Sequence, residues 1–236
     1  HNCKYRFGLT GTLDGTQTHQ LVLEGLFGAA EKVVTTKELI DKSTLANLKI
    51  KCLILKHPNI REKMTYAEEL EYIVSNEKRI DFVVNLLRHL NGNTLCLFQL
   101  VEKHGKILND KMKGSENVYF VYGGTDTSDR EKIRGLVETH TKSTTIASFG
   151  VFSTGINIRN INNIVLASPS KSKIRVLQSI GRGLRRSDSK DSILIYDIAD
   201  DISYNERRNF TLNHFTERLN IYNEEQFDYD ISKVKL

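Results

Sequence analysis

Residues 94–148 read TLCLFQLVEKHGKILNDKMKGSENVYFVYGGTDTSDREKIRGLVETHTKSTTIAS and show most clearly how this chain folds. Three short apolar runs, each typical of a buried strand, alternate in it with two polar segments of helical character. The expected strands are Leu95–Phe98, Val118–Val121 and Thr145–Ala147, and the expected helices are Val101–Met112 and Asp129–Thr139. Because strands alternate with helices, the stretch predicts an α/β architecture with a mainly parallel sheet.

The same alternation continues on both sides of this stretch. Further strands are predicted at Tyr5–Leu9, 32–34, Leu48–Leu55, Asn163–Leu166 and Ile193–Tyr196. Further helices are predicted at Thr16–Phe27, near Thr36, twice within 64–90, and at Lys171–Ile180 and Asn205–Tyr222. In doubly wound sheets, ligands bind where the strands end at their carboxyl side. The loops after Phe98, Tyr122, Ala147 and Leu166 are therefore the candidate functional positions.

Composition sets the outer limits of the interpretation. The 236 residues, 39% of them apolar, suit one domain plus a fragment or two small domains. The net charge of +5 permits nucleic-acid binding, but an ordinary basic protein fits equally well. Cys3, Cys52 and Cys96 are isolated and no His-Glu-x-x-His pattern occurs, so we expect neither a disulfide framework nor a metal site. No apolar run approaches the roughly 18 residues of a membrane span, and a cytoplasmic location fits best. The start at His1, without an initiator Met, suggests a fragment of a longer protein.

The most specific segment is QSIGRGLRR, residues 178–186. Gly181 and Gly183 flank Arg182, and Arg185 and Arg186 follow shortly after. Like charges this close are unfavourable without a compensating anion or carboxylate. The planar guanidinium fork of arginine binds phosphate oxygens in a bidentate way, and glycine lets a backbone approach closely. The segment therefore favours a phosphate-binding role, although a solvated basic turn remains an alternative.

The pattern Q-x-x-G-R-x-x-R resembles motif VI of superfamily 2 helicases and translocases, with Gln178, Gly181, Arg182 and Arg185 at its four positions. The resemblance implies that both arginines reach the γ-phosphate of ATP and stabilise charge that develops during hydrolysis. Arg185 is the first candidate for this arginine finger and Arg182 the second.

A second segment, IASFGVFSTGINI at 146–158, looks like motif V of the same family. The resemblance places Gly155 and Asn157 at the nucleotide, and Ser148 and Thr154 at nucleic-acid phosphates. Two departures stand out. Asn157 replaces the usual Asp and carries no charge, and the spacing from Ser148 to Gly155 is one residue longer than the commonest form. A glycine-rich turn after a strand is the alternative interpretation.

Three weaker segments gain meaning from their order. The triplet Thr10, Gly11 and Thr12 resembles motif III, which couples the nucleotide site to the nucleic-acid path. Gln99 ends the strand at the place of motif IV. The turn Gly123–Gly124 matches motif IVa, where backbone amides at a helix start can hold a DNA phosphate. A simple strand-to-helix turn capped by Asp126 or Ser128 is the alternative interpretation there.

The resemblance also implies a domain organisation on a RecA-like fold with helices on both faces of the sheet. Residues 1–31 would end a first RecA-like domain and form a linker, 32–222 would form the second RecA-like domain, and 223–236 a C-terminal tail. The phosphate loop G-x-x-x-x-G-K-[ST] and an acidic D-E-x-D or D-E-x-H motif are absent from the sequence. ATP and Mg²⁺ would therefore be bound mainly by the preceding domain, and this chain alone would be inactive.

The implied function is the C-terminal half of an ATP-dependent DNA helicase that unwinds or branch-migrates recombination and repair intermediates. Branched or forked DNA and the preceding RecA-like domain would be its partners, with no membrane involved. Two alternatives remain open. One is a subunit of a restriction-type translocase on double-stranded DNA, and the other is a non-catalytic nucleic-acid-binding module on a RecA-like fold.

Overall fold

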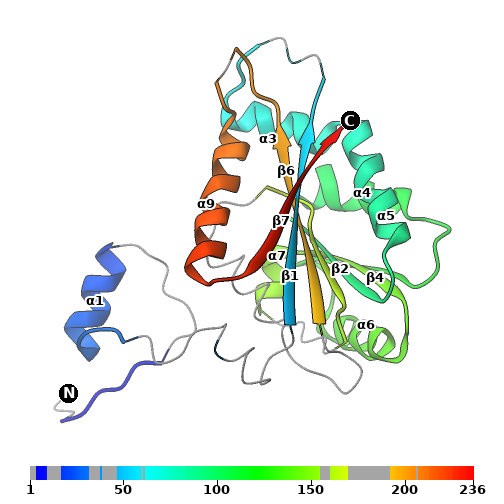
Figure 1. Cartoon of the computed structure of the whole chain (residues 1–236). Coiled ribbons are helices and arrows are strands. Elements are labelled where there is room, and N and C mark those ends of the chain that lie inside the picture. Colours follow the sequence, from blue (N-terminus) through cyan, green and yellow to red (C-terminus); the bar gives the residue numbers. More distant parts are fainter. Residues whose placement is uncertain are drawn as a thin grey trace.

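A computed structural model describes residues 4–9, 17–31, 38, 47–58, 60, 62–154, 160–169, 192–205 and 207–236. Its centre is a seven-stranded sheet with the order β3-β4-β2-β5-β6-β1-β7, in which every recorded strand pair is parallel (Figure 1). The predicted α/β architecture with a parallel sheet is thus confirmed.

The strands and helices follow the expected alternation. The strands are β1 (Asn47–Lys56), β2 (Asn93–Phe98), β3 (Val118–Val121), β4 (Ser143–Ser148), β5 (Asn163–Leu166), β6 (Ser192–Asp201) and β7 (Asp228–Lys235). The helices are α1 (Gln17–Phe27), α3 (Tyr66–Ser75), α4 (Glu77–His89), the π-helical turn η1 (Val101–Gly105), α5 (Lys106–Lys111), α6 (Thr127–Thr139), α7 (Phe149–Thr154) and α9 (Phe210–Glu224).

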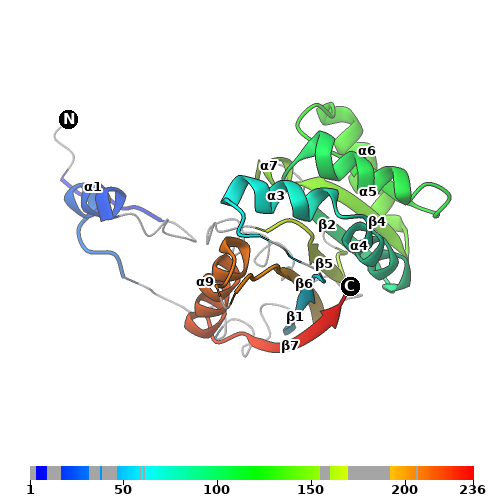
Figure 2. The same ribbon diagram turned by 90° about the horizontal axis from the view of Figure 1, so that it is seen from above.

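Helices cover both faces of the sheet, as Figure 2 shows from above. Successive residues of a strand point to opposite faces, so a central strand that is covered on both faces is buried at every position. In β2, Leu95 and Leu97 pack on the side of α6, α7 and α9, whereas Cys96 and Phe98 pack on the side of α4 and α5. All six residues of β2 and of β4 are buried, and at the polar start of these strands the Ser143 hydroxyl donates to the Asn93 side-chain oxygen at 2.7 Å.

Three expectations are corrected by the fold. Tyr5–Leu9 forms no strand, and none of the strands in the described part of the chain pairs with its backbone. The expected tail 223–236 instead completes α9 and forms β7, which pairs with β1 along eight residues. The helix predicted from Asn205 begins at Phe210, after Asn205 itself adopts a left-handed turn with φ 45°.

Two helical segments also differ from expectation. The helix predicted at Val101–Met112 opens with the π-helical turn η1, in which the N–H of Gly105 donates to the carbonyl of Leu100 at 2.9 Å. The glycine-rich segment after β4 begins as the short helix α7 rather than as a loop. Residues 32–34, the helix near Thr36 and Lys171–Ile180 lie outside the described residues.

The N-terminal part lies apart from the sheet in both views (Figures 1 and 2). It comprises residues 4–9 and α1, and it exposes a series of large apolar side chains, among them Tyr5, Phe7, Leu9, Leu21, Leu26 and Phe27. In the described parts of the chain, no helix has both the length and the apolar character needed to cross a membrane.

Candidate functional site

The carboxyl ends of β2, β3 and β4 bring several predicted residues to one edge of the sheet. Phe98 of β2 pairs with Ser148 of β4, so the exposed Gln99 comes next to the end of β4. β3 pairs with the other side of β4 and ends at Val121, shortly before the turn Gly123–Gly124. Parallel strands end at a common edge, and this geometry therefore gathers candidates that are up to about 50 positions apart in the chain.

Hydrogen bonds between neighbouring residues stabilise the Gly123–Gly124 turn. The N–H of Tyr122 donates to the Thr125 hydroxyl at 3.0 Å, and the Arg130 guanidinium donates to the carbonyls of Thr125 and Gly123 at 2.8 and 3.0 Å. A side chain at Gly124 would meet the Tyr122 ring at 2.7 Å. Among the described residues, the two glycine amides have no hydrogen-bond partner. They are available to bind an anion at the start of α6.

Asp126, one of the two expected caps, stands at the N-cap position of α6 but its side chain makes no capping hydrogen bond. Helix α6 therefore begins with donors that the protein itself leaves unused. Ser148 is buried at the end of β4, so little of its side chain is accessible to a ligand at this edge of the sheet.

The backbone after β2 is tied to the backbone after β5. The N–H of Gln99 donates to the Ser168 hydroxyl at 3.1 Å, and His104 Nδ1 lies 2.9 Å from the same hydroxyl. Burial, followed by the charge of Arg79, lowers the pKa of His104 from its usual 6.5 to about 3. The imidazole is thus neutral at physiological pH, and it holds the side chain of Ser168, the residue before Pro169.

A buried ion pair between Arg79 and Asp200 stabilises the same edge of the sheet. The Arg79 guanidinium in the first turn of α4 donates to Asp200 Oδ1 and to the Ala167 carbonyl, both at 2.8 Å. His57 Nε2 lies 2.8 Å from the same carboxylate oxygen. Burial opposes ionisation of Asp200, but Arg79 and His57 outweigh it and hold the pKa of Asp200 below its usual value. The pair joins the ends of β1, β5 and β6 to α4.

Sequence reasoning missed this buried network. Its visible signal was polar side chains inside apolar stretches, such as Asp200 at the end of β6 and Ser168 just beyond β5. Four of its atoms, His57 Nδ1, Arg79 Nη1, His104 Nε2 and Asp200 Oδ2, are buried without a hydrogen-bond partner among the described residues.

The predicted nucleotide and coupling residues lie outside the described residues. They are Thr10, Gly11, Thr12, Gly155, Asn157, Gln178, Gly181, Arg182 and Arg185. Thr154 ends α7, and its side chain also lies outside the described part. Within the described ranges, no cluster of three His, Cys, Asp or Glu side chains could hold a metal ion.

Comparison with known proteins identifies the architecture. The family model of the helicase conserved C-terminal domain matches residues 78–187. The ATP-dependent DNA helicase UvsW of Enterobacteria phage T4 is 34% identical over 255 aligned residues, which cover 100% of this chain and 50% of UvsW. The chain thus spans about half the length of this curated relative.

Solved structures agree. The crystal structure of T4 UvsW superposes with a TM-score of 0.70 at 34% identity, and the match covers 89% of this chain and 44% of that one. The type ISP restriction-modification enzyme LlaBIII bound to DNA reaches a TM-score of 0.59 at 13% identity, covering 90% of this chain and 17% of the enzyme, a likeness of fold alone. Residues 78–187 therefore match the helicase conserved C-terminal domain, the chain has a RecA-like fold, and it is similar to UvsW along its whole length.

Proposed function

We propose that this chain is the C-terminal half of an ATP-dependent DNA helicase that unwinds or branch-migrates recombination and repair intermediates. The observation that carries the proposal is the 34% identity with the DNA helicase UvsW across the entire chain. The segment Gln178–Arg186 supports it independently, because a module without ATP chemistry has no need of two arginines in this spacing.

In this proposal, ATP and Mg²⁺ lie between two RecA-like domains. The preceding domain supplies the phosphate loop and the magnesium carboxylates, which this sequence lacks. Arg185 and Arg182 contact the terminal phosphate only when the cleft is closed, and Gln178 positions them. Their fixed positive charge stabilises the charge that develops on the transferred phosphoryl group, which is the main catalytic need of such reactions. Gly155, Asn157 and Gly181 complete the nucleotide contacts.

The nucleic-acid contacts in this proposal lie at the carboxyl edge of β2, β3 and β4. The unused amides of Gly123 and Gly124 bind one phosphate, and Gln99, Ser148 and Thr154 contact the neighbouring backbone. Backbone contacts read no sequence, so binding should be insensitive to sequence and should weaken steeply with salt. The triplet Thr10–Thr12 couples this path to the nucleotide.

The exposed apolar side chains of the N-terminal part support the proposed neighbour. Contiguous exposed apolar groups are rare on monomeric surfaces and mark interaction sites. Phe7 and Leu9 are 87% and 100% exposed, and α1 adds Leu21, Leu26 and Phe27. In the proposal, these side chains pack against the rest of the first RecA-like domain.

The decisive experiment compares Arg185→Ala with Arg186→Ala in the full-length protein that contains this chain. The two arginines are adjacent and carry equal charge, but only Arg185 occupies a motif position. We expect Arg185→Ala to lower kcat for DNA-stimulated ATP hydrolysis by roughly 10³-fold or more with DNA affinity retained, and Arg186→Ala to leave kcat near its original value. Equal kcat in the two variants would remove Arg185 from the role.

Two further measurements test the class of motor. The 236-residue chain alone should show no DNA-stimulated ATPase activity, since it lacks the phosphate cradle. The full-length protein should separate strands of forked and four-way DNA in an ATP-dependent manner. Activity on plain duplex without strand separation would instead favour a restriction-type translocase.

A further inference from the structure

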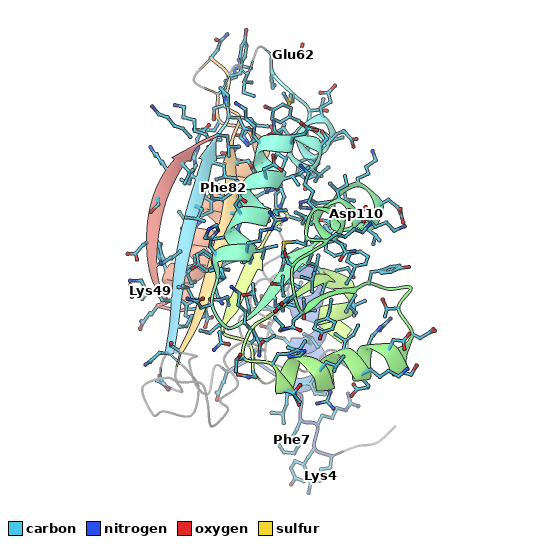
Figure 3. All side chains as sticks on the ribbon, turned by 90° about the vertical axis from the view of Figure 1, so that its right-hand side faces the viewer. Lys4, Phe7, Lys49, Glu62, Phe82 and Asp110 are labelled. Atoms are coloured by element: carbon cyan, nitrogen blue, oxygen red, sulfur yellow. The ribbon has the colours of Figure 1, made fainter. Side chains whose placement is uncertain are left out.

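An open pocket lies between two connections that leave the carboxyl ends of β1 and β6. Its volume is about 350 Å³. Lys63 comes from the β1–α3 connection, Tyr204, Arg207 and Arg208 from the β6–α9 connection, and Phe210 from the first turn of α9. The two connections run side by side at the top of Figure 1. Glu62 marks this end in Figure 3, opposite Lys49 at the amino end of β1.

Three positive side chains line this pocket, and the described residues offer them no acidic partner. Among the described residues, no carboxylate lies within ion-pair distance of Lys63, Arg207 or Arg208. Other surface lysines are paired, as Lys103 is with Glu71 and Lys111 with Asp81, each at 2.6 Å. Uncompensated cations that line one concavity form a site for anions.

Glu69 is the one carboxylate among the described residues of the lining, and it already accepts hydrogen bonds. Glu69 accepts hydrogen bonds from the backbone N–H groups of Phe210 and Thr211 at 2.9 and 3.0 Å, and it is buried. The Glu69 carboxylate therefore caps the N-terminus of α9 and points toward these backbone donors. The net charge of the side chains at the mouth of the pocket is therefore positive.

An aromatic ring stands beside these cations. Phe210 is 43% exposed, although a phenyl ring gains from burial. Tyr66 holds it edge-on at a centroid distance of 6.4 Å, and Tyr66 itself packs on His214 at 5.3 Å. A supported, exposed ring next to unpaired cations is the combination that binds single-stranded nucleic acid, by base stacking and phosphate pairing together.

We propose that this pocket, defined by Lys63, Tyr204, Arg207, Arg208 and Phe210, is a second binding site for single-stranded DNA. The inference rests on the proposed function and extends its DNA path from β3, β4 and β2 across β5 and β6 to β1. This path crosses five inter-strand steps of about 4.8 Å, or roughly 24 Å. At about 3.4 Å per nucleotide, a strand of roughly seven nucleotides reaches both sites.

The test measures DNA affinity of the 236-residue chain with two oligonucleotide lengths. An oligonucleotide of about 4 nucleotides fits the Gly123–Gly124 site alone, whereas one of about 20 reaches both sites. The variant is Lys63→Glu with Arg207→Glu. Arg208 is left intact because it donates to the Thr216 hydroxyl of α9 at 3.0 Å.

The matched control is Lys113→Glu with Lys142→Glu, which makes the same change in net charge. Both lysines precede strands, β3 and β4, and so lie at the amino edge of the sheet. We expect the pocket variant to lose about 10-fold or more in affinity for the long oligonucleotide and the control to lose much less. Loss of two phosphate contacts should reduce the slope of log K against log salt by about 1.4.

The stacking role has its own readout. Phe210→Leu should lower affinity for the long oligonucleotide by roughly 5- to 100-fold, whereas Phe210→Trp, which keeps an aromatic ring, should retain the original affinity. Because Phe210 is exposed, neither change should unfold the chain, and circular dichroism verifies this. A long oligonucleotide that carries 5-iodouracil should photo-crosslink to the peptide that contains Tyr204 and Phe210.

The outcomes separate the two proposals. If the pocket variant and the control bind the long oligonucleotide equally, the second site is overturned and the proposed function stands. If Phe210→Leu binds as tightly as the original chain, the stacking role is overturned. If the original chain binds neither oligonucleotide, both the pocket and the nucleic-acid part of the proposed function fail.

Discussion

Replacement of Arg79 by Met tests whether the buried ion pair holds the carboxyl edge together. Arg79 and Asp200 are both fully buried and lie 2.8 Å apart, and Arg79 also donates to the Ala167 carbonyl. Methionine keeps most of the side-chain volume, so the change removes charge and hydrogen bonds with little cavity formation. It leaves a buried carboxylate with only His57 as a partner.

The expected loss is large because an uncompensated buried charge costs more than its pair contributes. We expect Arg79→Met alone to lower the free energy of unfolding by about 3–5 kcal/mol, and Asp200→Leu alone to do the same. When both are replaced, no unpaired charge remains. The double variant should then lose only about 1–2 kcal/mol, chiefly for the unpaired His57. The effects are thus strongly non-additive.

Urea denaturation followed by far-ultraviolet circular dichroism provides the measurement, since the chain contains no Trp for fluorescence. A surface ion pair serves as the matched control. Arg134 and Glu138 lie one helical turn apart in α6 at 3.2 Å and are partly exposed. The same double-mutant cycle should give a coupling energy there of only about 0.3–0.5 kcal/mol.

The reasoning is wrong if Arg79→Met costs less than about 1 kcal/mol at an unchanged m-value. It is also wrong if the double variant is as unstable as the sum of the two single variants. Additivity would mean that the two side chains act independently in spite of their contact.

Two further predictions concern η1. The pKa of His104 is lowered to about 3, so its contribution to stability is complete above about pH 6.5 and is lost as pH falls toward 3. Urea titrations at pH 6.5 and 4.5 should show a loss of about 2–3 kcal/mol that His104→Asn lacks, and equal losses in both proteins would contradict the assignment. Gly105→Ala should destabilise by about 1–3 kcal/mol, because its Cβ would meet the buried Phe98 ring at 2.4 Å. The control Gly135→Ala, whose Cβ meets nothing within 4 Å on the exposed face of α6, should instead stabilise by about 0.5–1 kcal/mol in thermal melts.

Local pattern was enough to predict most elements of the sheet. The run Leu95–Phe98 is apolar at every position because both faces of β2 are covered, and this property can be recognised without coordinates. The common edge that gathers Gln99, Ser148 and Gly123 was also predictable, since parallel strands all end on one side. Tyr5–Leu9 misled the prediction because an apolar run specifies a strand only where a partner strand exists.

By itself, the sequence determined the parallel α/β class, the approximate positions of strands and helices, and the motif residues that resemble superfamily 2 helicases. Three contacts between distant segments are visible only in the folded molecule: β7 pairs with β1, Arg79 binds Asp200 across 121 positions, and Lys63 lines one pocket with Arg207 and Phe210. Helix and strand propensity act over a few neighbouring residues and are visible in the chain. Contacts between distant segments depend on how the helices pack on the sheet, and this packing cannot be predicted from a local sequence pattern.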